Sequence, residues 1–245
     1  MPVYQTMTEI ASEALRERIL TGQYPPGSRL KPGALEHELN LGRMAIREGL
    51  KELIASGLII QEANKGICVA GPPSAAELEA LFDARCALEG KAAVMAATKM
   101  SEETIGELER LHEEMKDPGK PTVEYFLLNR RFHLTLYKAS GWAHAVACTV
   151  NLLDQVISCF APSASRLILN FKPFNEDHRL ILDALLRKRT GDLHDLVVEN
   201  INRGRQLMVS LEGKSKMGRV KITAFKSRPS NAHSAKGGIA RGKSA

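Results

Sequence analysis

Apolar residues recur every three or four positions along most of this chain, which is the spacing of amphipathic helices. Near the beginning, such a stripe starts at the capping-box sequence of Thr6 and ends before Gly22. Two shorter helical segments follow at about 34–39 and 44–56. Asn40 stands between them, and asparagine readily takes the left-handed conformation that ends a helix. We therefore predict three helices with a tight turn between the second and the third.

The pattern changes to short strands after the third helix and then returns to helices. Residues 58–61 and 66–69 resemble two short strands on either side of a turn and predict a hairpin, and Pro72 and Pro73 then break the chain. Helical spacing resumes at the Ser74 capping box and predicts six helices. The first runs from Ser74 past Ala92 and the second from Ser101 to Asp117, and the others cover about 122–139, 143–160, 174–188 and 192–211. The predicted fold is mostly α, an N-terminal winged helix-turn-helix followed by an all-helical antiparallel bundle.

Charge divides the chain into the same parts. Residues 1–70 have no net charge and residues 71–213 carry −3, whereas residues 214–245 carry +9. We predict a winged helix-turn-helix domain at 1–70, a linker at 71–76, a helical domain at 77–213 and a disordered basic tail at 214–245. The tail either contacts phosphates nonspecifically or only improves solubility.

Composition narrows the class of protein. With 44% apolar and 25% charged residues, the chain is typical of a soluble globular protein. No run approaches the roughly 20 apolar residues that span a bilayer, and the first residues do not resemble a signal peptide. The four cysteines lie far apart without a C-x-x-C pair, which argues against a disulfide framework or a zinc ribbon. These features predict a cytoplasmic protein that does not bind a membrane.

Helix, helix, tight turn, helix and hairpin is the order of a winged helix-turn-helix. In that fold the third helix enters the major groove of DNA with its N-terminal residues toward the bases. Arg43, Met44 and Arg47 occupy that end, and arginine pairs with guanine or phosphate. Lys65 and Gly66 lie at the hairpin tip, within reach of the flanking backbone or the minor groove. The alternative is that the two arginines are solvated surface side chains, with Arg47 paired to a nearby glutamate.

The first 70 residues resemble the N-terminal domain of GntR-type bacterial transcription regulators. The resemblance covers nearly all of residues 8–70 and rests on several motifs in order: Tyr24-Pro25-Pro26-Gly27-Ser28-Arg29-Leu30, Leu35…Leu39, Arg43…Ile46-Arg47-Glu48…Leu50, Gly57-Leu58 and Asn64-Lys65-Gly66. The chain departs from the family in the turn. Asn40-Leu41-Gly42-Arg43-Met44-Ala45 stands where Gly-Val-Ser-Arg-Thr-Pro is usual, so two hydroxyls that usually contact phosphate are missing.

A few polar residues interrupt the apolar faces of the helical domain. Asn129 and His133 are four residues apart and so share one helix face, while His178 and Asn200 lie in later helices. Facing helices of a bundle can bring such side chains to one point. Two histidines are a start for a transition-metal site, although asparagine is a weak ligand. Alternatively, the histidines are simply hydrogen-bonded in the core.

Residues 77–211 resemble the six-helix, metal-binding effector domain (FCD) of the FadR branch of the same family. The matching pieces are Phe82-Asp83-Ala84-Arg85…Leu88-Glu89, Asn129-Arg130-Arg131-Phe132-His133, Ser140-Gly141 and His178…Ile181-Leu182-Asp183-Ala184…Gly191-Asp192. The resemblance implies Asp, His, His and His as metal ligands, but Asn129 and Asn200 replace the first and the last. His194 is not a substitute, because six residues place it on nearly the opposite helix face from Asn200.

Two hypotheses follow for this site. In one, His133, His178 and Asn129 hold Zn or Ni, with water completing the shell. In the other, no metal is present, and Arg85, Asn129, His133, His178 and Asn200 bind a small anionic metabolite directly. Arg85 also has a simpler interpretation, an ion pair with Glu89 one helical turn later.

The resemblance implies a sequence-specific regulator of transcription. We expect a homodimer on double-stranded DNA with a pseudo-palindromic operator, and repression relieved by a small carboxylate or sugar acid. Two other classes of protein stay open: a helical metal-dependent enzyme with an appended nucleic-acid-binding module, and a nonspecific nucleic-acid binder that uses the basic tail. We expect no enzyme, because the sequence contains no recognisable nucleophile motif and no evident general base beside the histidines.

Overall fold

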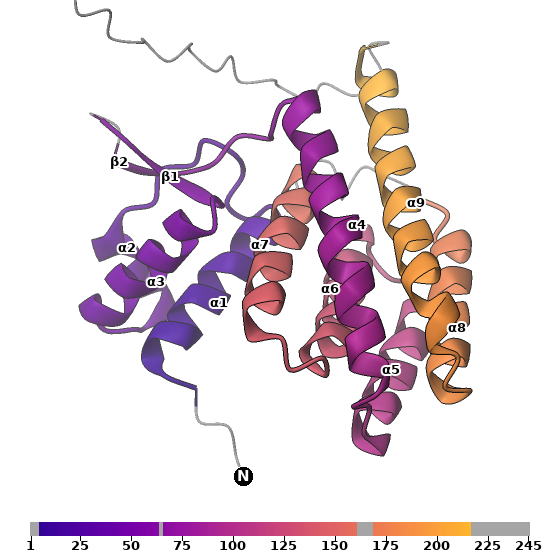
Figure 1. The fold of residues 1–245 in the computed structure, drawn as a ribbon. Helices are drawn as coiled ribbons and strands as arrows, with labels where there is room; N and C mark the ends of the chain where they lie inside the picture. Colours follow the sequence, from indigo (N-terminus) through magenta and orange to yellow (C-terminus); the bar gives the residue numbers. More distant parts are fainter. Residues whose placement is uncertain (1–4, 64–65, 161–168, 217–245) are drawn as a thin grey trace, which may run out of the picture.

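The computed structural model describes residues 5–63, 66–160 and 169–216 and places two helical domains side by side (Figure 1). Two predictions concern residues outside these ranges, the DNA contact by Lys65 and the disorder of the basic tail from residue 217 onward. Within the described ranges, no helix is both long enough and apolar enough to span a bilayer.

The first domain consists of three helices and a hairpin, as predicted. Its elements are α1 (Met7–Leu20), α2 (Pro32–Leu39), α3 (Arg43–Ala55), β1 (Ile59–Glu62) and β2 (Gly66–Val69). The strands pair antiparallel with Ile59 opposite Val69, so β1 begins one residue later than the pattern suggested. Leu15, Ile46 and Leu50 are fully buried where α1 packs on α3.

Local sequence explains how these helices begin and end. The Thr6 side chain accepts a hydrogen bond from the Glu9 backbone, and the Glu9 carboxylate accepts one from the Thr6 backbone. Asn40 ends α2 in the left-handed conformation (φ 51°), which confirms the prediction for the tight turn.

The second domain is a bundle of six helices. They are α4 (Ala75–Ala97), α5 (Glu102–Met115), α6 (Thr122–Lys138), α7 (Ala143–Phe160), α8 (Lys172–Leu186) and α9 (Thr190–Lys216). Ser74 forms the predicted capping box with Glu77. Helix α8 begins two residues earlier than predicted, because Pro173 fits the first turn of a helix. Helix α9 continues through Gly213 to Lys216, because one helical glycine costs only about 1 kcal/mol.

The bundle has a continuous apolar core. Helix α4 packs against α9 and α7, α5 packs against α6, and α8 packs against α9. The largest fully buried side chains in this domain are Phe82, Phe132 and Tyr137. They surround the polar residues that the sequence placed on the inner faces.

A buried ionic cluster joins the two domains. Asp154 of α7 is fully buried and forms ion pairs with Arg16 of α1 and Arg130 of α6. Gln155 adds a hydrogen bond of 3.0 Å from its side-chain amide to the Ser56 carbonyl oxygen, at the end of α3. Helix α7 therefore contacts both α1 and the end of the third helix (Figure 1).

Candidate DNA interface and buried histidine site

Helix α3 presents a free N-terminus to solvent. Its N-cap residue is Gly42, which provides no side-chain cap, and the first turn contains no acidic residue. The first backbone N–H groups of a helix lack partners within the helix and attract anions such as phosphate. The glycine that replaces the usual hydroxyl residue thus leaves these donors uncapped.

Three side chains project from this end of α3. Arg43, Met44 and Arg47 are exposed, and Met44 retains 69% of its accessible surface. In the part of the chain that the structure describes, neither arginine forms an ion pair, and Glu48 pairs instead with Lys51. Among the described residues, no glutamate forms an ion pair with Arg47, which speaks against the alternative interpretation.

The hairpin adds a basic side chain that the sequence analysis missed. Gly66 begins β2 with φ 80°, a conformation that favours glycine. The guanidinium of Arg29 lies beside it, 3.6 Å from where a Cβ of residue 66 would be. Arg29 reaches this place because its backbone forms an isolated bridge with Cys68, a pairing that no periodic pattern indicated.

In the second domain, the structure brings His133 and His178 together. Their Nε2 atoms are 3.3 Å apart, and both side chains are buried. The Tyr137 hydroxyl donates to Glu89 at 2.8 Å, so it accepts a hydrogen bond from Nδ1 of His133 at 2.9 Å. We infer that the lone pair of His133 Nε2 faces His178.

Burial keeps this histidine pair neutral. It lowers the pKa of His133 to about 4 and the pKa of His178 well below its usual value. Nδ1 of His178 has no hydrogen-bond partner among the described residues. With this tautomer the Nε2–H of His178 donates to His133, so the pair presents the lone pair of His178 Nδ1 to a neighbour, without a positive charge.

Arg85 is connected to the pair through Glu89. The guanidinium of Arg85 donates to both carboxylate oxygens of Glu89, at 2.6 and 3.2 Å, and both side chains are buried. The ion pair expected from the sequence is thus present, but it lies inside the bundle. A continuous chain of hydrogen bonds runs from Arg85 through Glu89 and Tyr137 to His133.

The two asparagines have different surroundings. Asn200 is buried, and its amide donates to Asp177 at 3.4 Å. Arg203 holds the same Asp177 carboxylate through two hydrogen bonds. Asn129 is half-buried one turn before His133. His194 is half-exposed and pairs with Asp195, in agreement with its predicted place on the other helix face.

The donor set around the histidine pair fits Zn or Ni poorly. The 3.3 Å separation suits a hydrogen bond, and it also suits two ligands of one tetrahedral zinc at about 2.0–2.1 Å each, so this distance does not discriminate. The charges do discriminate, because the nearest carboxylates, Glu89 and Asp177, are already paired with arginines. Within the described ranges, no three His, Cys, Asp or Glu side chains are grouped to hold a metal ion. A divalent cation would gain two imidazoles and neutral amides but no charge compensation.

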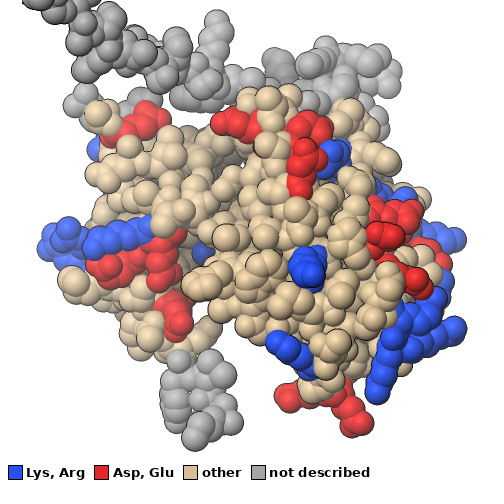
Figure 2. Space-filling model, in the orientation of Figure 1, with Lys and Arg blue, Asp and Glu red and all other residues tan. Residues whose placement is uncertain are grey.

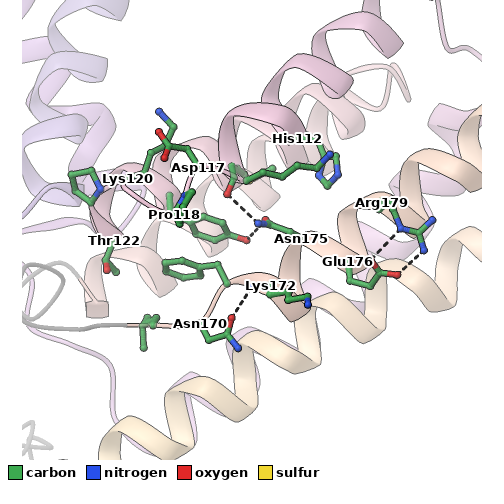
Figure 3. A pocket seen from close by; sticks show the side chains of 16 residues that line it. His112, Asp117, Pro118, Lys120, Thr122, Asn170, Lys172, Asn175, Glu176 and Arg179 are labelled. Atoms are coloured by element: carbon green, nitrogen blue, oxygen red, sulfur yellow. Dashed lines mark hydrogen bonds and ion pairs between the residues drawn. The ribbon is translucent and has the colours of Figure 1, made fainter.

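A cavity of about 820 Å³ opens near the pair, between the connection of α5 to α6 and the beginning of α8 (Figure 3). None of the five predicted effector residues lines it. His112 of α5 does, and its ring centroid is 6.5 Å from that of His178. The sequence analysis did not single out His112, because its position in the apolar stripe of α5 resembles that of a core residue.

Comparison with known families covers both domains. Residues 8–69 match the family described as bacterial regulatory proteins, gntR family, and residues 80–203 match the FCD domain. The chain belongs to the GntR family and carries an FCD domain. This GntR-family protein is therefore a DNA-binding regulator of transcription, which confirms the prediction from the motifs. Its placement in the FadR branch stays a prediction.

Three proteins similar to this chain are named as regulators of transcription. The uncharacterized HTH-type transcriptional regulator YdhC of Bacillus subtilis (strain 168) is 24% identical over 78% of this chain and 81% of its own length. The HTH-type transcriptional repressor GlaR of Escherichia coli (strain K12) is 24% identical over 76% and 89%. A probable D-xylose utilization operon transcriptional repressor of Paenarthrobacter nicotinovorans is 28% identical over 74% and 80%.

Solved structures share the fold of this GntR-family protein. E. coli McbR/YncC superposes with a TM-score of 0.71 at 20% identity and covers 85% of this chain and 100% of its own. A putative transcriptional regulator GntR from Rhodococcus sp. RHA1 gives 0.64 at 22% identity, over 83% and 98%. At these identities the likeness supports the winged helix-turn-helix and bundle architecture alone.

Proposed function

We propose that this protein is a cytoplasmic repressor that binds a pseudo-palindromic operator and releases it when a small carboxylate or sugar acid binds the helical domain. The uncapped N-terminus of α3 carries this proposal, with two arginines on its exposed face that form no ion pair with the residues that the structure describes. Arg43, Met44 and Arg47 would read base edges, while Lys65, Gly66 and Arg29 would contact the flanking backbone. Two of the named relatives are repressors.

An uncharged face of the helical domain supports a homodimer. Asp154, which is buried, is the one Asp, Glu, Lys or Arg residue in the sequence of helix α7. Its exposed side presents Ala143, His144, Ala147 and Cys148. The surface over α7 is largely free of charge, whereas charged side chains lie over the upper part of α4 and at the sides of the molecule (Figure 2). A two-fold dimer through this face would present two α3 helices to the two half-sites of an operator.

The contacts between the domains offer a route for control of DNA binding. Helix α6 carries both His133 at the buried site and, three residues earlier, Arg130 in the ionic cluster. The same cluster includes Arg16 of α1, and Gln155 holds the end of α3. An effector that favours another position of α6 would therefore change the orientation of α3, to the extent of its differential affinity for the two states.

We favour direct binding of the effector by Arg85, Asn129, His133, His178 and Asn200, without a metal ion. The supporting observation is that Glu89 and Asp177 are neutralised by arginines, so a cation would lack an anionic ligand. The same pairing argues against a metal-dependent enzyme, because neither carboxylate is free to act as a general base.

Operator binding tests the main proposal. The preferred DNA sequence is selected from random duplexes with the full chain, and affinities are measured by fluorescence anisotropy at one salt concentration. Arg47→Ala should lose about 1–3 kcal/mol on the selected site, as expected for a base contact. Arg187→Ala, which removes an exposed arginine of the helical domain, should bind like the unmodified protein.

Two outcomes would contradict the proposal. Unchanged affinity in Arg47→Ala would remove α3 from the interface. If deletion of residues 217–245 abolished most of the binding, and the selected sequences shared no motif, the nonspecific tail-driven alternative would hold instead.

The metal-free site is tested by elemental analysis of the untagged protein after loading with Zn or Ni and dialysis. We expect much less than one metal ion per chain, both in the unmodified protein and in the double variant His133→Ala, His178→Ala. A near-stoichiometric metal that disappears in the double variant would overturn direct binding and restore the metal-site hypothesis.

A further inference from the structure

The cavity beside α8 has one polar side chain at its inner wall that lacks a partner. His112 is 4% exposed, and neither of its ring nitrogens has a hydrogen-bond partner among the described residues. No interaction line reaches its ring in Figure 3, whereas Asn175 next to it bonds both Tyr125 and Met115. An unpaired buried polar side chain is costly, so its presence in the wall of a cavity indicates a ligand-binding role.

The charged residues around the cavity favour an anion. Its lining contains four basic side chains, Lys116, Lys120, Lys172 and Arg179, and only two acidic ones, Asp117 and Glu176. Three of the basic side chains already have acidic partners. Lys172 is exposed and forms no ion pair within the described part of the chain. One cationic group at the rim is thus available to a ligand.

The beginning of α8 adds a second attraction for negative charge. The Lys172 backbone N–H already donates to the Asn170 side chain at 3.1 Å, and Pro173 has no N–H, so this end attracts an anion through the helix dipole rather than through free N–H groups; Lys172 and Asn175 in the first turn line the cavity. The positive end of the helix dipole therefore lies at the cavity wall. A carboxylate near Lys172 would be stabilised by this dipole as well as by the lysine charge.

The aromatic part of the cavity wall favours a ligand that also has an apolar part. The rings of Tyr125 and Phe171 are stacked, with centroids 3.6 Å apart, and both line the cavity together with Leu169 and Met115. A small inorganic anion would leave this surface unused. A molecule that combines one anionic group with an apolar chain or ring would bury both parts.

We infer that this cavity binds an organic carboxylate, with its anionic group between Lys172 and the N-terminus of α8, a polar contact to His112, and its apolar part against Tyr125 and Phe171. The inference rests on the proposed effector control and extends it to an outer site that none of the five central residues lines. The rings of His112 and His178 form a T-shaped pair with centroids 6.5 Å apart, so His112 connects the outer site to the buried histidine pair.

The test uses 8-anilinonaphthalene-1-sulfonate as an anionic aromatic probe of the full chain. We expect saturable fluorescence with one probe per chain, and displacement at least tenfold better by 4-phenylbutyrate than by the uncharged 4-phenylbutanamide. Lys172→Glu should weaken probe binding at least tenfold. Lys138→Glu, the same charge change at an exposed lysine outside the cavity, should change it less than twofold.

A second variant tests the buried contact. His112→Leu should weaken displacement by the carboxylate, and His112→Gln should retain part of it, provided that both melt like the unmodified protein. Because Lys172 is exposed, its variant remains informative even if His112→Leu does not fold. Equal displacement by the acid and the amide, or unchanged probe binding in Lys172→Glu, would overturn the inference.

Failure of this inference is distinguishable from failure of the proposed function. Operator binding by the protein without ligand, and its loss in Arg47→Ala, do not depend on the cavity. Conversely, probe binding to the cavity does not depend on the arginines of α3.

Discussion

Asp154 is the side chain whose replacement most directly tests how the two domains are held together. It is fully buried and accepts hydrogen bonds from Arg16 and Arg130, the latter at 2.5 and 3.3 Å. Glu13, the other acidic neighbour of these arginines, is more than half exposed. Asp154→Asn keeps the size of the side chain but removes the charge that neutralises two largely buried guanidinium groups.

The expected cost follows from this burial. Breaking a buried ion pair by removing one partner typically destabilises a protein by about 3–5 kcal/mol, because the remaining charge is left uncompensated. For a chain of this size, about 1 kcal/mol corresponds to a shift of about 2–4 °C in Tm. We therefore expect Asp154→Asn to lower the Tm by roughly 10 °C. Asp183→Asn, at a surface ion pair with Arg179, should shift it by no more than a few degrees.

Thermal unfolding followed by circular dichroism measures this difference. The triple variant Arg16→Met, Arg130→Met, Asp154→Leu should recover most of the lost stability, because buried ion clusters can often be replaced by apolar side chains of similar volume. A Tm of Asp154→Asn within 2 °C of the unmodified protein would refute the reasoning. A triple variant no more stable than Asp154→Asn would show that lost geometry, rather than unpaired charge, causes the effect.

Three smaller predictions concern local structure, and chemical denaturation measures each of them. Ser74→Ala removes the capping box of α4 and should cost about 1 kcal/mol, so an unchanged midpoint would contradict its role. Gly49→Ala should destabilise by about 1–3 kcal/mol, because its Cβ would lie 3.0 Å from the Ser12 backbone nitrogen where α1 crosses α3. Gly106 lies in the middle of α5, and an added Cβ there would meet no atom, so Gly106→Ala should instead stabilise the protein by about 0.5–1 kcal/mol. Equal effects of the two substitutions would show that close packing of α1 and α3 is not the cause.

The order of elements and the family were predictable from the sequence because they depend on local information. Helix starts at Thr6 and Ser74, the left-handed Asn40 and the two short apolar runs of the hairpin are each encoded within a few residues. The motifs of the GntR family are also local, since they follow one another at fixed distances along the chain. Helix spacing further predicted that Asn200 and His194 would lie on different faces, and the structure bears this out.

The sequence did not show which side chains meet at the histidine site, the hairpin and the cavity, because those side chains are distant from one another along the chain. The sequence predicted that His133 and His178 share a site, but it could not show that Tyr137 and Glu89 orient one of them. It also placed Arg85 and Glu89 as neighbours without showing that they are buried. Arg29 and His112 were overlooked because only the folded chain brings them to the hairpin and to the cavity.

The sequence by itself determined the helices, the hairpin, the two-domain order and the regulator family of this protein, because periodicity, caps and motifs act over a few neighbouring residues. Only the tertiary structure decided which charges neutralise one another. Asp154 meets arginines 138 and 24 residues away, and the pairing of Glu89 and Asp177 with arginines leaves the histidine pair without an anionic metal ligand. Burial and long-range contact set the chemistry of both sites, and neither quantity is a local property of the chain.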